Sequence, residues 1–344
     1  MTNSKINISG EYVIKFLGII SLVWVILTYA SALILPILVS VIIATLLDKP
    51  TKMMKKWKFP SWLAISISIL ITAIIFILLF WLISSQVNNI ANDWSVIREK
   101  AMEKFELFSS WMQSNFQVNP RKVFNKNVDF FNQLRTLAQG FLSSVTNIFT
   151  SSLLVLIYTI LFLMQKDFFI RFFKKLVKNN SGAANILKDS AQIISGYLLG
   201  KVKIMFFLFV IYFIGFKVGQ VPYALFLALF AALFSIIPYV GNIIGGGVAV
   251  ILSYLYAGAT PALIVVAVIS ATQLIENYIL TPWIIGDEID LNPFITVFGV
   301  ILFSSLWGIV GAIIALPIVG VLKVVFQHTE GLEAYAYLLK KPKK

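Results

Sequence analysis

Long apolar stretches follow one another along most of this chain, and they constrain its fold more than any other feature. The stretch from Tyr12 to Leu47 contains one charged residue, Lys15, and the stretch from Ser61 to Ser85 contains none. About 20 apolar residues suffice to cross a bilayer as a helix, which satisfies its own backbone hydrogen bonds in lipid. The sequence therefore predicts an all-α polytopic membrane protein.

The composition agrees with a membrane location and restricts the chemistry. Charged residues make up 12% of the chain and hydrophobic residues 59%, whereas soluble domains contain about 25% charged residues. Cysteine is absent and His328 is the only histidine, which argues against thiolate or histidine metal sites and against Ser/His or Cys/His catalytic pairs. We expect no metal, no cofactor and no catalytic residues, and hence no enzyme.

The positive charges predict how the chain is oriented. Lysines are concentrated in the segments 48–58 and 166–203 and in the C-terminal tail. Basic loops usually lie on the cytoplasmic side, where they also meet anionic lipid head groups. We therefore expect both termini to be cytoplasmic. The net charge of +13 is interpreted as lipid contact and topology, not as nucleic-acid binding.

The alternation of apolar and polar stretches predicts about eight transmembrane helices in six segments. The segment 293–326 is either one tilted helix or a hairpin that turns near Ser304-Ser305. The six segments are residues 1–85 with about three spans, a helical extracytoplasmic amphipathic segment 86–140, a span 141–165, a basic cytoplasmic segment 166–203, a C-terminal core 204–326 and a basic cytoplasmic tail 327–344.

The C-terminal core contains a weak internal repeat. Pro222-Tyr223 followed by Val240-Gly241-Asn242-Ile243-Ile244-Gly245 is similar to Pro293-Phe294 followed by Val310-Gly311-Ala312-Ile313-Ile314-Ala315. By the expected orientation, the two copies enter the membrane from opposite sides. Inverted repeats with broken helices are common in secondary transporters, but chance matches between helices rich in Gly, Ile and Ala are also common.

Glu276 is the only charged residue between Val218 and Gly286. A charge at membrane depth costs several kcal/mol, so such residues are usually functional. Gln273 and Asn277 lie at helical spacing from Glu276, and these three polar side chains could bind a solute, an ion or a proton. The alternative is a hydrogen-bonded clamp between helices. Tyr278, Tyr239 and Asn242 complete the candidate binding set.

Prolines and glycines predict where helices break in the C-terminal half. Pro282 disturbs the preceding turn and frees carbonyl groups around Tyr278, and broken backbone at membrane depth requires cover by protein or a water-filled cavity. Ordinary helix ends and tight turns are the alternatives. The expected hinge or broken-helix positions are Pro238, Gly241, Gly245, Gly246, Pro282, Gly286, Pro293 and Pro317.

An ordered set of motifs in the C-terminal half resembles the signature of the autoinducer-2 exporter family, also called PerM-like permeases. The motifs are Pro238-Tyr239-x-Gly241, Gln273-x-x-Glu276-Asn277-x-x-Leu280-x-Pro282-x-x-x-Gly286, Leu291-x-Pro293, Gly308-x-x-Gly311 and Ala315-x-Pro317. The resemblance covers nearly the whole chain. The family pattern usually has Leu-His-Pro where this chain has Leu291-Asn292-Pro293, which leaves no titratable side chain at that position.

The resemblance implies an all-helical homo-oligomeric permease of a bacterial inner (plasma) membrane, with residues 204–326 as its transport core. Members of the family are described as exporters of autoinducer-2, as general permeases and in some cases as Na⁺(Li⁺)/H⁺ antiporters. Our leading hypothesis is gradient-driven export of a small polar solute with Glu276 as the coupling or solute-binding carboxylate. The alternatives are a Na⁺(Li⁺)/H⁺ antiporter that uses the same carboxylate, and a membrane scaffold that docks through residues 86–140.

Overall fold

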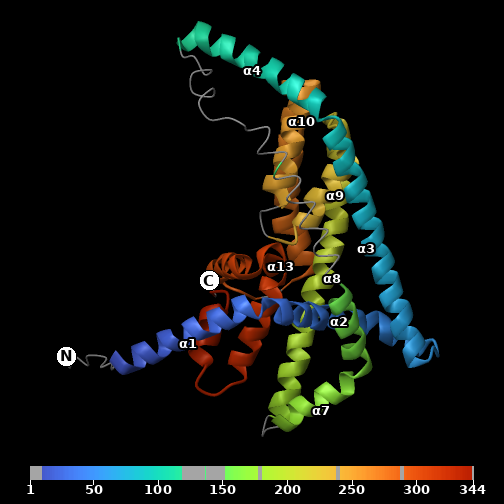
Figure 1. The fold of residues 1–344 in the computed structure, drawn as a ribbon, viewed down its shortest axis with the longest axis vertical. Helices are drawn as coiled ribbons and strands as arrows, with labels where there is room; N and C mark the ends of the chain where they lie inside the picture. The colour runs from blue at the N-terminus through green and yellow to red at the C-terminus, as the bar shows by residue number, and fades with distance from the viewer. Residues whose placement is uncertain are drawn as a thin grey trace.

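The computed structural model describes residues 10–117, 136, 152–176, 180–237, 241–286 and 290–342. Within these ranges the regular elements are helices, without a strand, and one isolated β-bridge joins Leu291 to Lys340. The all-α class expected from the apolar stretches is therefore confirmed. Figure 1 shows α8, α9, α10 and α13 gathered in a bundle that α1 and α2 cross at its lower part.

The elements in chain order are α1 (Gly10–Tyr29), α2 (Ser31–Lys56), α3 (Ser61–Asn92), α4 (Trp94–Phe116), a helix over Ser152–Met164, α7 (Lys166–Leu176), α8 (Asn180–Val218), α9 (Ala224–Phe234), η1 (Gly241–Gly246), α10 (Gly247–Ala257), α11 (Ala259–Ile275), η2 (Glu276–Leu280), α12 (Thr281–Ile284), α13 (Pro293–Gln327) and α14 (Glu333–Leu339). The two η elements are π-helices.

The described residues contain five helical segments long and apolar enough to cross a membrane. A sixth is added if Ser152–Met164 and Lys166–Leu176, which meet at a 74° bend, form one broken span. The predicted number of eight is not confirmed. The five are Ser31–Lys56, Ser61–Asn92, Gly182–Val218, Ala259–Ile284 and Pro293–Gln327.

Two helices run across positions where a boundary between segments was expected. The boundary at 203/204 falls inside α8 and the boundary at 85/86 falls inside α3. Neither helix contains an internal proline, so both continue past the end of the apolar run that was used to place the boundary. Helix α9 contains only 11 residues, about 16 Å of helix against a hydrocarbon core of ~30 Å.

Helices α9 and α10 form a hairpin whose arms approach closely near the turn. A Cβ on Gly241 would lie 2.5 Å from the Ala231 carbonyl oxygen, and one on Gly245 would lie 2.7 Å from the Ala231 Cα. Glycine is therefore required at both positions for the two backbones to meet. Residues 238–240, which include Pro238 and Tyr239, lie outside the described residues.

Helix α13 is a second hairpin rather than one straight span. Trp307 and Gly308 leave the helical conformation, with φ 60° at Gly308, a value that favours glycine. A Cβ on Gly299 would lie 3.0 Å from a Val319 methyl group, and one on Gly311 only 1.9 Å from the Phe303 carbonyl oxygen. The chain therefore turns back at Trp307–Gly308 and not at Ser304-Ser305, because only glycine readily supplies the positive φ.

Helix α4 leads away from the bundle at the top of Figure 1. At its start Tyr223 donates a hydrogen bond to Asp93, and the Lys100 ammonium lies 4.8 Å from the centre of the Tyr256 ring. Burial raises the pKa of the Tyr223 hydroxyl and the hydrogen bond to Asp93 raises it further, so the phenol stays protonated and keeps its donor. One end of the amphipathic helix is thus fixed to the bundle.

The C-terminal helix α14 is fastened to the loop before α13. The backbone N–H of Asn292 donates to the Leu339 carbonyl oxygen at 2.9 Å, and the Lys323 ammonium donates to the Asp290 carbonyl oxygen at 2.6 Å. Lys340 lies 3.9 Å from the Asp290 carboxylate. A loop near the start of the second hairpin is therefore held by residues from both later helices.

Candidate functional site

Glu276 begins the π-helix η2, which joins α11 to α12 without ending the helix. Pro282 supplies no backbone N–H and its ring crowds the carbonyl four residues earlier, at Tyr278. A widened turn relieves this crowding, and π-turns of this kind are frequent at functional sites. The local irregularity expected around Pro282 is thus a π-turn within a continuous helix.

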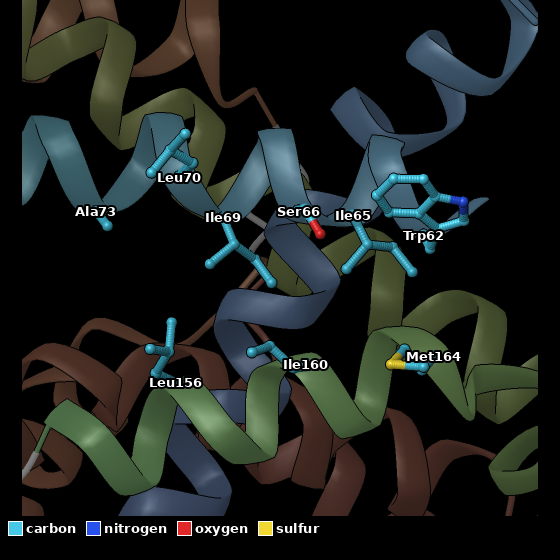
Figure 2. A pocket seen from close by; sticks show the side chains of 9 residues that line it. All are labelled: Trp62, Ile65, Ser66, Ile69, Leu70, Ala73, Leu156, Ile160 and Met164. Atoms are coloured by element: carbon cyan, nitrogen blue, oxygen red, sulfur yellow. The ribbon is translucent and has the colours of Figure 1, made fainter. Parts of the chain in front are cut away.

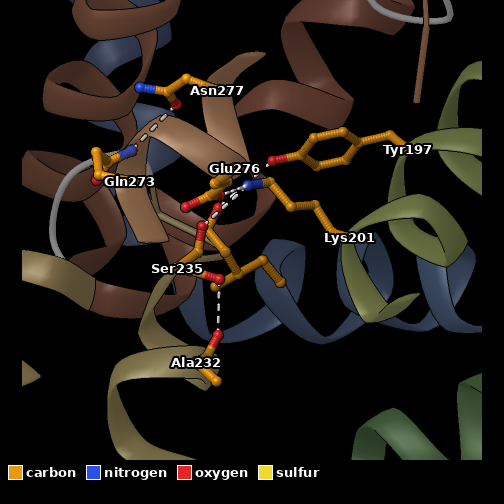
Figure 3. A network of polar contacts seen from close by, with 8 residues as sticks. Tyr197, Lys201, Ala232, Ser235, Gln273, Glu276 and Asn277 are labelled. Atoms are coloured by element: carbon orange, nitrogen blue, oxygen red, sulfur yellow. Dashed lines mark hydrogen bonds and ion pairs between the residues drawn. The ribbon is translucent and has the colours of Figure 1, made fainter. Parts of the chain in front are cut away.

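Glu276 faces the interior of the bundle, where it forms an ion pair with Lys201 (Figure 3). The Lys201 Nζ lies 3.0 Å from the Glu276 Oε1 and also donates to the Ser235 carbonyl oxygen at 3.1 Å. The exposed fraction is 6% for Glu276 and 8% for Lys201. The pair therefore connects η2, α8 and the chain just after α9.

The end of α9 supplies the third member of this cluster. Carbonyl groups in the last turn of a helix have no partner further along the helix and carry partial negative charge. Lys201 binds the Ser235 carbonyl there, and the Tyr197 hydroxyl donates to the Ile236 carbonyl at 3.4 Å. Tyr197 lies one turn before Lys201 on α8, so two side chains of one helix face hold the end of α9.

Burial makes this ion pair costly to disturb. Removing two charges from water costs several kcal/mol per ion, and mutual attraction with further hydrogen bonds offsets that cost. Removing only one partner leaves an uncompensated charge, typically at a cost of about 3–5 kcal/mol. The charge states of Glu276 and Lys201 are therefore linked, since neutralising one destabilises the other.

Gln273 and Asn277 lie on another side of the same helix (Figure 3). They bond to each other, with 3.0 Å between the Gln273 Nε2 and the Asn277 Oδ1, and Asn277 is exposed. Successive residues differ by about 100° around a helix, so Asn277 does not face Lys201 when Glu276 does. The expected single polar face is divided into a buried ion pair and a more exposed amide pair.

The other candidate residues are spread over the C-terminal half. Tyr278 is 76% exposed, and the structure brings it into no contact with the ion pair. Tyr239 and the side chain of Asn242 lie outside the described residues, as does Pro238. Gly246 packs against Ile269 of α11, Gly286 follows α12 with φ 58°, Pro293 begins α13, and Pro317 is buried in its second arm.

Three residues of this site are not among those expected from the sequence: Lys201, Ser235 and Tyr197. Lys201 lies in the expected basic segment 166–203, where it is one lysine among several. Helical spacing distinguishes Lys201 from the other lysines of this segment, because Lys201 continues a series of buried positions on one face of α8. That series is Ile194, Tyr197, Leu198, Lys201, Ile204 and Leu208.

The long apolar helices, with two hairpins and a buried ion pair among them, define a multi-pass helical membrane protein. Residues 15–331 match the model of the AI-2E family transporters, and the chain belongs to this family. Its members are transport proteins rather than enzymes, and a transporter implies a solute as substrate. The family expected from the C-terminal motifs is confirmed.

Individual relatives match over much of their length. The putative transport protein YueF of Bacillus subtilis is 29% identical over 321 residues, which cover 87% of this chain and 85% of the relative. The AI-2 transport protein TqsA of Escherichia coli is 22% identical over 345 residues, 98% of each chain. The putative transport protein YrrI of B. subtilis is 31% identical over 198 residues, 55% of each chain.

Proposed function

We propose that this protein exports a small polar solute across a bacterial plasma membrane, with both termini on the cytoplasmic side. The solute is autoinducer-2 or a related quorum-sensing signal. Family membership supports transport, and the name of one relative, the AI-2 transport protein TqsA, supports the choice of solute. An ion or solute gradient drives the export.

The buried ion pair between Lys201 and Glu276 is the observation that carries this proposal. A proton or solute group that reaches Glu276 weakens its attraction to Lys201. Lys201 also holds the Ser235 carbonyl at the end of α9, so weakening the pair loosens the α9–α10 hairpin. Glu276 thereby couples ligand binding to movement of a hairpin, while Lys201 keeps the site closed between cycles.

Flux of autoinducer-2 through proteoliposomes under an imposed pH gradient tests this proposal. We expect Glu276→Gln, reconstituted at the same amount of folded protein as the unmodified chain, to reduce flux to the level of protein-free vesicles, even though the unpaired Lys201 also lowers the stability of the variant. Glu330→Gln is the matched control, because it removes an exposed carboxylate outside the candidate site. Normal flux in the Glu276→Gln variant would remove this carboxylate from the mechanism.

A Na⁺(Li⁺)/H⁺ antiporter is the second candidate function. Here the Lys201 ammonium occupies the place of a cation between a carboxylate and a backbone carbonyl, and such oxygens are also suitable ligands for hard metal cations. Sodium or lithium would bind after Lys201 withdraws. Everted vesicles with a pH-sensitive dye distinguish the two functions, because Na⁺ or Li⁺ addition causes dequenching only if the protein is an antiporter.

The scaffold alternative and the homo-oligomer both concern α4. This helix exposes Leu107, Phe108, Trp111 and Phe116, a surface suited to packing against another chain. We propose that it contacts a second copy in a homo-oligomer. Because the chain has no cysteine, Phe108→Cys introduces a single thiol, and disulfide-linked dimers in membranes support the contact. If deleting residues 94–116 broke a complex with another protein but left flux intact, the scaffold function would be favoured.

A further inference from the structure

An open apolar groove of about 350 Å³ lies between α3 and the helix Ser152–Met164, far from the ion pair in sequence. Figure 2 shows side chains from both helices pointing into it. On α3 the lining residues recur at helical spacing from Trp62 to Ala73, and on the other helix Leu156, Ile160 and Met164 are four residues apart. Ser66 supplies the only hydroxyl among the nine lining residues.

The groove has the length and opening that suit a chain from the surrounding bilayer. From Trp62 to Ala73 it follows α3 for about 16 Å, roughly half of a ~30 Å hydrocarbon core. Trp62 and Met164 mark one end, while Ala73 and Leu156 mark the other (Figure 2). The apolar lining disfavours a hydrophilic solute, since its polar groups would lose water without gaining partners.

One end of the groove is strongly basic. Lys55, Lys56 and Lys58, all exposed, occupy the end of α2 and the turn immediately before Trp62. Exposed Trp57 and Trp62 flank this turn, and tryptophan is favoured at the level of lipid head groups. An occupant that places an apolar chain in the groove would therefore bring its head group beside three positive charges.

An ion pair between α2 and α7 lies near this same end of the groove. The Lys166 Nζ lies 2.5 Å from the Asp48 Oδ1, and the Nζ of Lys52, one turn further along α2, lies 2.9 Å from the Asp48 Oδ2. Lys166 follows Met164 by two residues, so the Lys166–Asp48 pair joins α2 to the chain just after the helix Ser152–Met164, which lines one side of the groove. Ala44, Leu47, Ile65 and Leu163 form a buried apolar cluster among the three helices. The groove is thus bounded by packed and paired elements.

We propose that this groove binds one acyl chain of an anionic phospholipid from the bilayer, with its phosphate held by Lys55, Lys56 and Lys58. The apolar lining accepts the chain and the lysines select the negative head group. A second copy of the protein is disfavoured as the occupant, because a symmetric contact at this place would bring the same lysines of both copies together.

Native mass spectrometry of the protein released from nanodiscs with equal amounts of phosphatidylglycerol and phosphatidylcholine tests the proposal. We expect about one phosphatidylglycerol retained per chain, at least ~5-fold more often than phosphatidylcholine, given the attraction of several lysines for an anionic lipid. Ala73→Trp fills the groove and should abolish retention. Ile74→Trp, on an exposed position beside the groove, should retain the lipid.

Charge variants test the head-group contact independently of the groove. Lys55→Gln/Lys56→Gln/Lys58→Gln should retain the two lipids equally. Arg171→Gln/Lys174→Gln/Lys175→Gln removes the same charge from exposed positions of α7 and should keep the preference. Undiminished retention by Ala73→Trp, equal retention of both lipids by the unmodified protein, or disulfide cross-linking of two Ala73→Cys copies would each overturn the proposal.

Discussion

Two parts of the molecule contain similar charged groups in different surroundings. The first is the C-terminal part from α8 to α13. The second consists of α2, α3, the helix Ser152–Met164 and α7. Each contains a lysine–carboxylate pair between separate helices. In the first part the exposed side-chain fractions of Lys201 and Glu276 are 10% and 8%, whereas in the second those of Lys166 and Asp48 are 37% and 25%.

This difference teaches that burial, not the presence of an ion pair, decides what the pair can do. Water screens and replaces an exposed pair, which contributes about 0–1 kcal/mol. A buried pair cannot exchange its partner for water, so a change of charge on one member forces a rearrangement. The dense C-terminal part is therefore suited to coupling, and the open second part to contact with lipid.

The largest expected effect is that of Lys201→Met, which leaves the buried carboxylate of Glu276 without its partner. We expect a loss of about 3–5 kcal/mol in the free energy of unfolding, measured by denaturant titration in detergent micelles. The double variant Lys201→Met/Glu276→Gln should recover most of the loss. A loss below ~1 kcal/mol in the single variant would break the comparison, since the buried pair would then behave like an exposed one.

The next effect concerns the close approach of the arms of α13. Gly311→Ala places a methyl group 1.9 Å from the Phe303 carbonyl oxygen in the unrelaxed structure, and overpacking of this kind costs about 1–3 kcal/mol. Gly247→Ala is the matched control, because a Cβ at that position meets nothing within 4 Å. Equal stability of the two variants in thermal unfolding would show that the second hairpin is loosely packed.

Tyr223→Phe tests the contact between α4 and the bundle. Loss of the hydrogen bond to Asp93 should cost about 0.5–1.5 kcal/mol and increase hydrogen exchange at the start of α4. Tyr254→Phe is a suitable control, because it removes a tyrosine hydroxyl that lies on α10 rather than beside Asp93. Unchanged exchange in the Tyr223→Phe variant would indicate that apolar packing alone fixes α4.

The smallest effect is expected for Lys166→Met, which breaks the half-exposed pair with Asp48. We expect a loss of about 0.2–1 kcal/mol, and most of this loss should disappear in about 1 M salt, where the Debye length is about 3 Å. The loss caused by Lys201→Met should persist under the same conditions. If the loss of stability in the Lys166→Met variant persisted at high salt, the Lys166–Asp48 pair would be less accessible to water than its exposed fraction indicates.

The sequence predicted much of the helical pattern because that pattern depends on local composition. Apolar runs located α2, α3 and the helix after Ser152. Segment boundaries were less predictable, because an α-helix such as α8 continues wherever nothing interrupts its backbone hydrogen bonds. The turn of α13 required the conformation of Gly308, which an apolar pattern does not encode.

The candidate site was only partly predictable for a different physical reason. Glu276 is conspicuous because a charge in an apolar stretch is energetically exceptional. Its partner Lys201 is 75 positions away in the sequence and is surrounded there by lysines of a basic segment. The carbonyl groups of Ser235 and Ile236 carry no side-chain signature at all. Contacts of this kind arise from packing between helices and require coordinates.

The fastening of α14 to the loop before α13 has a consequence for how the second hairpin moves. Leu339 and Lys340 contact Asn292 and Asp290, so the chain before α13 and the chain after it are joined. Neither arm of α13 can then tilt alone without breaking these contacts, and we expect the two arms to move as one unit.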